Sequence, residues 1–384
     1  MSAESDERVR RNAGETDELD RPAAAAPNSR RDFLRSVGAI GALGAAAMVP
    51  GATRLAAQAD AGKGSMGPRR IDVHEHMFAP AYKRAAKMGV AQSASTKRRA
   101  SPLVSHWTPE GAIEEMEKNG VATAVVSIPV SGISFNEPGE ASRALARGNN
   151  EYGAQLVRDY PGHFGFFASL PFADREGSLK EIEYSLDTLH ADGIALMTNY
   201  GTRWPGDAIY DPIYEELNRR KAVVFVHPTT PACCGELIPG VSPAWEEFDF
   251  DTARAGTSLL VNHTFEKFPD IQFILTHCGG ALPVESARIQ DYITPGVFGK
   301  KPGTAESYFS KVFYDIAAGA NPMALAALTQ LVDTSHILFG TDFPFVRMDT
   351  TVDGYLQWGF SSEERRQINR ENALGLLPRL KAHA

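Results

Sequence analysis

The chain has 384 residues, of which 43% are hydrophobic and 22% are charged. This composition is typical of a globular protein and excludes a largely disordered chain. The net charge of −8 excludes a generally basic, nucleic-acid-binding surface. Three cysteines are too few for a scaffold that is held together by disulfides.

The first part of the chain is predicted to lie outside the folded domain. Residues 1–59 begin with a disordered, charged n-region, which is followed by the Arg-Arg motif of Arg30–Leu34. A short apolar stretch (36–51) and a small-residue cleavage site at Ala57–Ala59 follow. This combination resembles a twin-arginine signal peptide, which implies the twin-arginine export machinery as a partner and a periplasmic or secreted mature protein. The apolar stretch is too short and too rich in glycine for a stable membrane anchor.

Residues 60–384 are predicted to form the mature domain, in which strands and helices alternate. Short apolar runs rich in β-branched and aromatic residues are typical of parallel strands that are covered on both faces. Two helix starts are marked, by Thr108-Pro109 and by a capping box of Ser361 with Glu364. The predicted strands are Ile71–His74, Ala122–Pro129, Phe164–Pro171, Gly193–Thr198, Ala222–His227, Ile271–His277, Val312–Ala317 and Ile337–Asp342.

Eight strands that alternate with helices predict an α/β protein with a single-domain (β/α)8 TIM barrel. A doubly wound open sheet is the alternative, but no glycine fingerprint follows the first strand. Insertions follow strand one (Ala79–His106) and strand five (Thr229–Glu247), and both would lie at the mouth where barrels bind substrate. The second insertion contains Cys233 and Cys234, which we expect to be free thiols, or to include one exposed cysteine that oxidises, because adjacent cysteines rarely bridge.

Polar side chains end several of these strands. His74 and His76 lie two apart at the end of strand one, so both rings can face the same point. His227 ends strand five, His277 ends strand six and Asp342 ends strand eight. Imidazoles with one carboxylate suit zinc, with manganese as the alternative. Each residue alone has an ordinary structural explanation, such as a satisfied core histidine or a capping aspartate, but their order on a barrel favours a metal site.

Four motifs carry a resemblance to a known family: Ile71–His76, Val226–Pro228, Thr276–Pro283 and Gly340–Pro344. They are similar to the amidohydrolase superfamily, and more narrowly to the branch that contains aminocarboxymuconate-semialdehyde, γ-resorcylate and 5-carboxyvanillate decarboxylases. Glu216–Pro228 and Asp251–Arg254 look closest to the 6-methylsalicylate decarboxylase-like members. The resemblance covers essentially the whole mature chain.

The resemblance implies a role for each strand-end residue. His74, His76, His227 and Asp342 become ligands of one divalent metal, and His277 becomes the catalytic histidine. Asp342 would alternate between ligand and proton carrier. Binuclear relatives carry a carboxylated lysine on strand four, whereas this chain has Leu196-Met-Thr-Asn-Tyr200 there. A mononuclear site is therefore expected, and members of this branch commonly form homodimers.

The function implied is metal-dependent, non-oxidative decarboxylation of a hydroxybenzoate-like or related unsaturated carboxylic acid. The alternative is a mononuclear hydrolase of a lactone, ester or amide, and a non-catalytic binding protein is the third hypothesis. An anionic substrate calls for a cation, for which Arg254 is the first candidate and Arg98 the second. Tyr200 and Trp107 are candidates for aromatic walls around the substrate.

Overall fold

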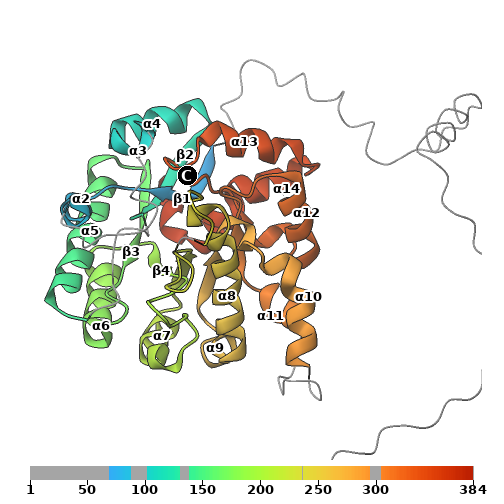
Figure 1. Cartoon of the computed structure of the whole chain (residues 1–384). Coiled ribbons are helices and arrows are strands. Elements are labelled where there is room, and N and C mark those ends of the chain that lie inside the picture. Colours follow the sequence, from blue (N-terminus) through green and yellow to red (C-terminus); the bar gives the residue numbers. More distant parts are fainter. Residues whose placement is uncertain (1–68, 88–101, 130–137, 236, 295–303, 384) are drawn as a thin grey trace, which may run out of the picture. The chain divides into compact units, whose positions relative to one another are not determined.

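The computed structural model describes residues 69–87, 102–129, 138–235, 237–294 and 304–383, and the predicted leader at 1–59 lies outside them. Eight parallel strands follow one another from β1 to β8, which confirms the predicted (β/α)8 barrel (Figure 1). The strands are β1 (Arg70–His76), β2 (Val121–Ser127), β3 (Phe164–Ser169), β4 (Gly193–Met197), β5 (Val223–His227), β6 (Gln272–Leu275), β7 (Phe313–Asp315) and β8 (Ile337–Leu338).

The first strand closes the barrel by pairing with the segment that follows the last one. The Val73 N–H donates to the Phe339 carbonyl at 3.0 Å, and the Asp342 N–H donates to the His74 carbonyl at 2.7 Å. These bonds bring the two ends of the folded domain together. They also place two predicted site residues on neighbouring backbone segments.

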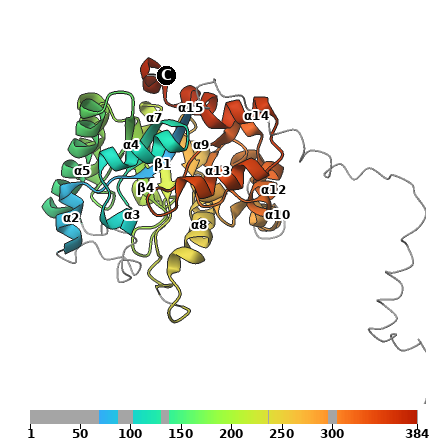
Figure 2. The same ribbon diagram turned by 90° about the horizontal axis from the view of Figure 1, so that it is seen from above.

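Helices surround the strands on the outside (Figure 2). Two of them begin as predicted: Thr108 caps α4 by accepting the Gly111 N–H, and Ser361 and Glu364 form the capping box of α14. The α-helices are α2 (Pro80–Lys87), α3 (Pro102–Ser105), α4 (Pro109–Lys118), α5 (Glu140–Asp159), α6 (Arg175–Glu183), α7 (Asp211–Arg219), α8 (Glu247–Val261), α9 (Thr264–Lys267), α10 (Leu282–Ile293), α11 (Ala305–Phe309), α12 (Pro322–Leu331), α13 (Met348–Gln357), α14 (Ser362–Arg366) and α15 (Asn372–Leu376).

Shorter helical segments complete the fold. Two are π-helical, η3 (Tyr184–Thr188) and η8 (Gln367–Glu371). The others are the 3-10 segments η4 (Ala208–Tyr210), η5 (Pro243–Trp245), η6 (His277–Gly279), η7 (Thr334–His336) and η9 (Pro378–His383). Within the described part of the chain, none of the helices has both the length and the apolar character needed to cross a bilayer.

An apolar cluster fills the inside of the barrel. Phe167 and Phe225 stack there with their ring centroids 5.0 Å apart, and the His74 ring lies 5.0 Å from Phe225. Leu380 of η9 belongs to the same cluster and packs near Gly165 at the beginning of β3, so it closes the amino end of the barrel. The polar strand ends therefore lie on this apolar cluster, which excludes water from the amino-end side of the site.

A register shift in β1 directs its histidines inward. Ile71 and Val73 belong to the inner cluster, so the odd-numbered positions face the barrel interior at first. The pairing with β2 shifts between Asp72 and Glu75. Beyond that shift the even-numbered histidines of β1 face the interior. The shift therefore explains why both Val73 and His74, although adjacent, lie on the inner side of the barrel.

Both predicted insertions are present. The first contains α2 and α3, and residues 88–101 between them lie outside the described residues. The second precedes α8 and contains a disulfide between Cys233 and Cys234, so the expectation of free thiols was wrong. The Cys234 N–H donates to the Pro231 carbonyl at 3.0 Å.

Candidate metal centre and catalytic site

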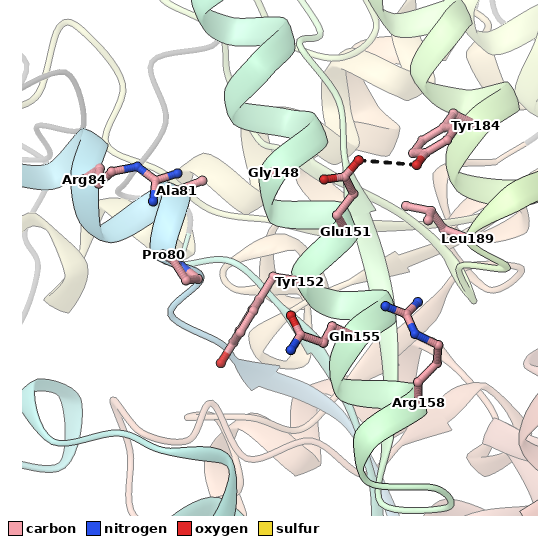
Figure 3. Close-up of a pocket in the computed structure, with 10 residues that line it drawn as sticks. All are labelled: Pro80, Ala81, Arg84, Gly148, Glu151, Tyr152, Gln155, Arg158, Tyr184 and Leu189. Carbon is pink, nitrogen blue, oxygen red and sulfur yellow. Dashed lines mark hydrogen bonds between the residues drawn. The ribbon is translucent and has the colours of Figure 1, made fainter.

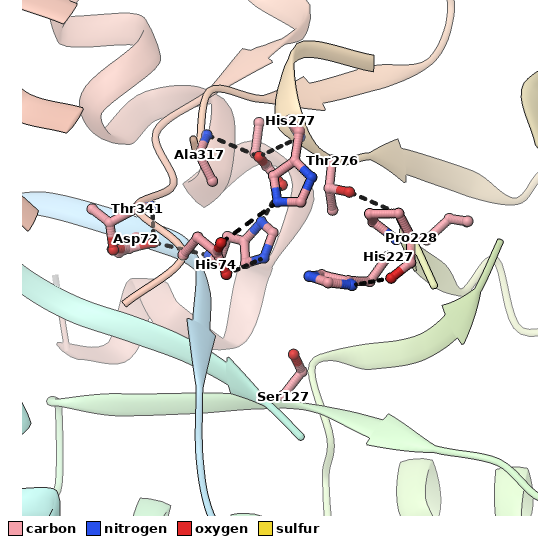
Figure 4. Close-up of polar contacts among 12 residues, drawn as sticks. Asp72, His74, Ser127, His227, Pro228, Thr276, His277, Ala317 and Thr341 are labelled. Carbon is pink, nitrogen blue, oxygen red and sulfur yellow. Dashed lines mark hydrogen bonds and ion pairs between the residues drawn. The ribbon is translucent and has the colours of Figure 1, made fainter. Parts of the chain in front are cut away.

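The polar strand ends meet at the carboxyl end of the barrel. The ring of His74 lies 5.1 Å from that of His76, 5.0 Å from that of His227 and 5.0 Å from that of His277. The carboxylate of Asp342 lies beside them, with Oδ1 2.9 Å from the His76 Nε2 and 3.4 Å from the His74 Nε2. The five residues are all buried. Strand ends far apart in sequence thus form one compact polar cluster (Figure 4).

Four of these residues form the tightest group. One potential ligand atom from each of His74, His227, His277 and Asp342 lies within 4.8 Å of the others. His76 is held against Asp342 and is not in this group, whereas His277, which we expect to be catalytic, is in it. The geometry brings the five predicted strand-end residues together. The division into ligands and catalytic histidine remains a prediction from the family resemblance.

Unusual backbone conformations place two of these side chains. His277 and Asp342 both have positive φ, at 56° and 66°, which is uncommon for residues other than glycine and is often found at functional sites. Gly280 also has positive φ, and a Cβ there would lie 2.3 Å from the Asp249 carbonyl oxygen of α8. Gly280 therefore lets this turn pack tightly against α8.

The free nitrogens of the cluster fit a divalent cation. Among the described residues, the buried Nε2 atoms of His74, His227 and His277 have no hydrogen-bond partner. The His227 Nδ1 lies 2.8 Å from the Pro228 carbonyl oxygen, which can only accept, so Nδ1 carries the proton and Nε2 keeps its lone pair. Buried polar atoms without partners are costly, and a cation bound at the His74 and His227 nitrogens would satisfy those two.

The charges of the cluster also suit a cation. Burial lowers the pKa of His227 well below its ordinary value and that of His277 to about 4, so both rings are neutral. Burial alone would raise the pKa of Asp342, but the adjacent rings of His74 and His76 hold it well below its usual range. Burial also opposes the charged form of His74, yet the carboxylates of Asp315 and Asp342 raise its pKa to about 10. A cation at the His74 Nε2 would displace this proton.

Two buried carboxylates lie next to the cluster. Asp315 ends β7, and its Oδ2 lies 2.9 Å from the His74 Nδ1. Asp315 was not predicted from the sequence, although a polar residue at a strand end is the signal that identified the others. Glu75 lies between the two histidines of β1, is fully buried, and has no hydrogen-bond partner in the described residues. Burial raises the pKa of Glu75 well above its ordinary value, so it is a neutral acid.

Aromatic side chains surround the cluster on its open side. The Phe345 ring lies 5.2 Å from His76 and is 47% exposed, and the Phe248 ring lies 6.2 Å from His227. Phe78 lies 6.1 Å from Phe345 and 5.9 Å from Trp107. The indole of Trp107 is buried, and its Nε1 has no partner among the described residues. Trp107 thus belongs to an aromatic layer that reaches the metal-facing histidines.

The other residues predicted to bind substrate have different surroundings. The buried Tyr200 accepts the Met197 N–H, and its ring packs 4.7 Å from Phe172. Arg254 is 40% exposed and lies 3.5 Å from Glu247 and 3.6 Å from Asp251, both on its own helix α8. Arg98 lies outside the described residues. The geometry therefore gives Tyr200 a packing role and Arg254 partners within its helix.

A separate pocket of about 550 Å³ lies beside α2 and α5 (Figure 3). Arg84, Glu151 and Arg158 are among the residues that line it. None of the residues predicted to bind metal or substrate lines this pocket. It is therefore a surface feature distinct from the histidine cluster.

The fold and the cluster define a (β/α)8 barrel with a histidine–aspartate centre at the carboxyl ends of its strands. Residues 71–379 match the Amidohydrolase family, and the chain belongs to this family. The match covers the whole barrel, from the first strand to η9.

Relatives and solved structures resemble the chain over most of its length. It is 34% identical to Decarboxylase macB of Penicillium terrestre over 81% of this chain and 96% of the relative. It is 32% identical to the 6-methylsalicylic acid decarboxylase of Penicillium expansum over 81% of this chain and 97% of the relative. The structure of 5-carboxyvanillate decarboxylase from Novosphingobium aromaticivorans, which contains manganese, superposes with a TM-score of 0.73, 20% identity and coverage of 82% and 99%.

Proposed function

We propose that the protein is a metal-dependent, non-oxidative decarboxylase of a hydroxybenzoate-type acid. The observation that carries the proposal is the cluster of three unpartnered histidine nitrogens and one ionised carboxylate beneath an aromatic layer. Relatives that span nearly the same length are decarboxylases, one of them of 6-methylsalicylic acid. An aromatic acid fits the ring contacts of this layer better than an aliphatic one.

The metal, when bound, acts as a Lewis acid on an oxygen of the substrate. The histidine donors favour zinc, and the manganese in a solved neighbour makes manganese the alternative. Because the strand-four end carries no lysine, we favour a mononuclear site over a hydrolase that needs a lysine-bridged pair of metals.

The chain's own residues manage the proton. His277 is neutral because burial lowers its pKa to about 4, so it can accept the phenolic proton of the substrate. Its Nε2 lies 3.8 Å from the Asp342 Oδ2, so the two groups face each other across the cluster without a direct hydrogen bond. The carbon–carbon bond to the carboxyl group breaks, CO2 leaves, and the ring carbon takes up a proton from this pair. Phe345 and Phe78 limit the access of water.

The proposal includes the cellular setting. The leader-like segment of residues 30–59 supports export by the twin-arginine route to the periplasm or exterior. Such export moves folded proteins, which suits an enzyme whose metal is bound before it leaves the cytoplasm. A homodimer is proposed on the family resemblance alone.

The first experiment combines metal analysis with a product assay on residues 60–384. About one zinc or manganese per chain is expected, with release of CO2 from 6-methylsalicylate or 2,6-dihydroxybenzoate. Asp342→Ala should lose both the metal and the activity because it removes the only negatively charged member of the cluster. Asp349→Ala is the matched control, since this exposed carboxylate pairs with Arg347 on the surface.

Two results would contradict the proposal. Wild-type protein that folds and turns over without metal would exclude the metal mechanism. Metal-loaded protein that adds water to a lactone or ester, and releases no CO2 from aromatic acids, would establish the hydrolase instead.

A further inference from the structure

One carboxylate connects two members of the histidine cluster. The fully buried Asp315 places Oδ2 2.9 Å from the ring Nδ1 of His74. Its other oxygen, Oδ1, accepts the backbone N–H groups of His277 and Ala317, each at 3.0 Å (Figure 4). Asp315 therefore contacts the side chain of a predicted metal ligand and the backbone of the predicted catalytic histidine at the same time.

The space around this contact is set by Gly340. A Cβ at Gly340 would lie 2.9 Å from the His74 Cβ and 3.1 Å from the Asp315 Cβ. Both distances are shorter than side chains normally allow. Gly340 does not have positive φ, so other residues could adopt its backbone conformation. Glycine is needed here for the room it leaves between the two side chains.

We propose that Asp315 is a positioning residue that fixes the His74 ring for metal binding while it holds the backbone of His277, and that Gly340 provides the clearance for this contact. A carboxylate only accepts hydrogen bonds, so the His74 Nδ1 must carry the proton that joins the two groups. In the neutral ring the lone pair of Nε2 then faces the cluster, where the Asp342 Oδ1 lies 3.4 Å away. The inference rests on the metal-binding part of the proposed function and holds for a decarboxylase or a hydrolase.

A second buried carboxylate shows what a purely structural role looks like. Asp72 accepts the backbone N–H groups of His74 and Thr341 and the Thr341 hydroxyl. It joins β1 to the segment after β8, and no contact with a histidine ring is found among its described hydrogen bonds. Asp315 differs because its Oδ2 contacts the imidazole ring of His74.

The direct test is Asp315→Asn, which keeps the shape of the side chain. Asparagine can still accept the His277 N–H through Oδ1, but its amide then offers a donor to the His74 Nδ1. This favours a proton on Nε2, the atom that should bind metal. We expect the metal dissociation constant, measured by chelator competition, to rise about 10–100-fold.

The matched control is Asp192→Asn. Asp192 is a buried carboxylate that pairs with Arg379 and accepts the Phe166 N–H at the amino end of the barrel. It should lower the melting temperature of the metal-free protein while it leaves the metal dissociation constant unchanged. Wild-type metal affinity in Asp315→Asn, or an equal loss in Asp192→Asn, would overturn the proposal.

A second variant tests the same contact without a change in charge. Gly340→Ala should push His74 and Asp315 apart and weaken metal binding in the same direction. Gly256→Ala is its control, because the added Cβ would approach most closely the movable end of Leu282, at 2.9 Å, and would lie 3.5 Å from the end of Leu275. Unchanged metal affinity in folded Gly340→Ala would show that the clearance is unimportant.

A measurement on the unmodified chain covers the case in which these variants fail to fold. In zinc-loaded wild-type protein with ¹⁵N-labelled histidine, His74 should show a protonated Nδ1 and no proton on Nε2. The reverse arrangement would overturn the proposal. Wild-type protein that binds no metal would defeat the proposed function as well, whereas metal binding that is indifferent to Asp315 would defeat only the positioning role.

Discussion

The hydroxyl of Tyr200 has a hydrogen-bond partner within the protein, without any substrate. It accepts the Met197 N–H at 3.0 Å, at the end of β4. Tyr200→Phe would leave that N–H buried without its partner, which should cost about 1–3 kcal/mol of the free energy of unfolding. Urea unfolding should register the loss, while KM stays unchanged. A raised KM with unaltered stability would instead support the predicted substrate contact.

Proton competition at His74 should make metal binding depend on pH. The pKa of His74 is raised to about 10, with burial outweighed by the charge of Asp315, so metal-free protein carries this proton at neutral pH. Binding at Nε2 releases it, and the affinity should rise about tenfold per pH unit below pH 10. His227 and His277 add no further dependence there because their pKa values are low. Chelator competition between pH 6 and 8 checks this, and a flat profile would contradict it.

Site residues could be predicted from the sequence where they lie at the ends of strands. The clustering of His74, His227 and Asp342 follows from their positions after buried runs. Asp315 carries the same signal but was overlooked, since one aspartate at a strand end has many ordinary roles. Its partner His74 is 241 residues away, and no local pattern reveals which ring a carboxylate will contact.

An ion-pair network ties α7 to η3. Glu216 lies 2.7 Å from Arg219 and 2.6 Å from Arg220, which in turn lies 2.6 Å from Asp187. Hydrogen bonds from Arg219, opposed by partial burial, lower the pKa of Glu216 from 4.5 to about 2. A lowered pKa in the folded state means that the stabilisation is present above pH 4.5 and is lost as the pH falls towards 2.

Glu216→Gln should therefore reduce stability at neutral pH by about 1 kcal/mol, a value discounted for solvent screening. The difference from wild type should shrink as the pH falls below 4.5, because the wild-type carboxylate is then protonated more readily in the unfolded chain. Thermal melts at pH 7, 4 and 3 test this. Glu215→Gln, an exposed neighbour, is the control, and an equal effect of both variants would contradict the network's role.

Seven strands were predicted within two residues at each end, and β8 ends four residues before its predicted end. The apolar run to His277 suggested a strand through that residue, yet β6 ends at Leu275 and His277 turns into η6 with positive φ. The run to Asp342 likewise shrinks to the short β8. The hydrogen bonds between neighbouring strands end where the chain turns and directs its polar side chains into the site. A hydrophobic run indicates that residues are buried, but it does not show where these inter-strand hydrogen bonds end.

At the scale of the whole molecule, the fold class was predictable because the alternation of strand and helix repeats around the entire barrel. Burial on both faces of each strand leaves a strong signal in the sequence. The inner cluster of Phe167, Phe225 and Leu380 was less predictable, because it depends on side chains that meet only after closure.

The predicted leader can be tested on the full chain. Replacing Arg30 and Arg31 with lysine should leave full-length precursor in the cytoplasm, because the twin-arginine route reads this pair. Immunoblots of cell fractions measure the distribution. The same replacement at Arg10 and Arg11 is a matched control, since this upstream pair lacks the Phe-Leu context. Normal processing of both variants would show that the leader prediction is wrong.

The closure of β1 against the segment after β8 determines when the centre can form during synthesis. His76 and Asp342, which contact each other, stand 266 residues apart in the chain. At about 5–20 residues per second, a ribosome needs roughly 13–50 s to make the stretch between them. During that time His76 has been synthesised but its partner Asp342 has not. Cation capture by the full set of residues therefore belongs to the finished barrel and cannot nucleate its folding.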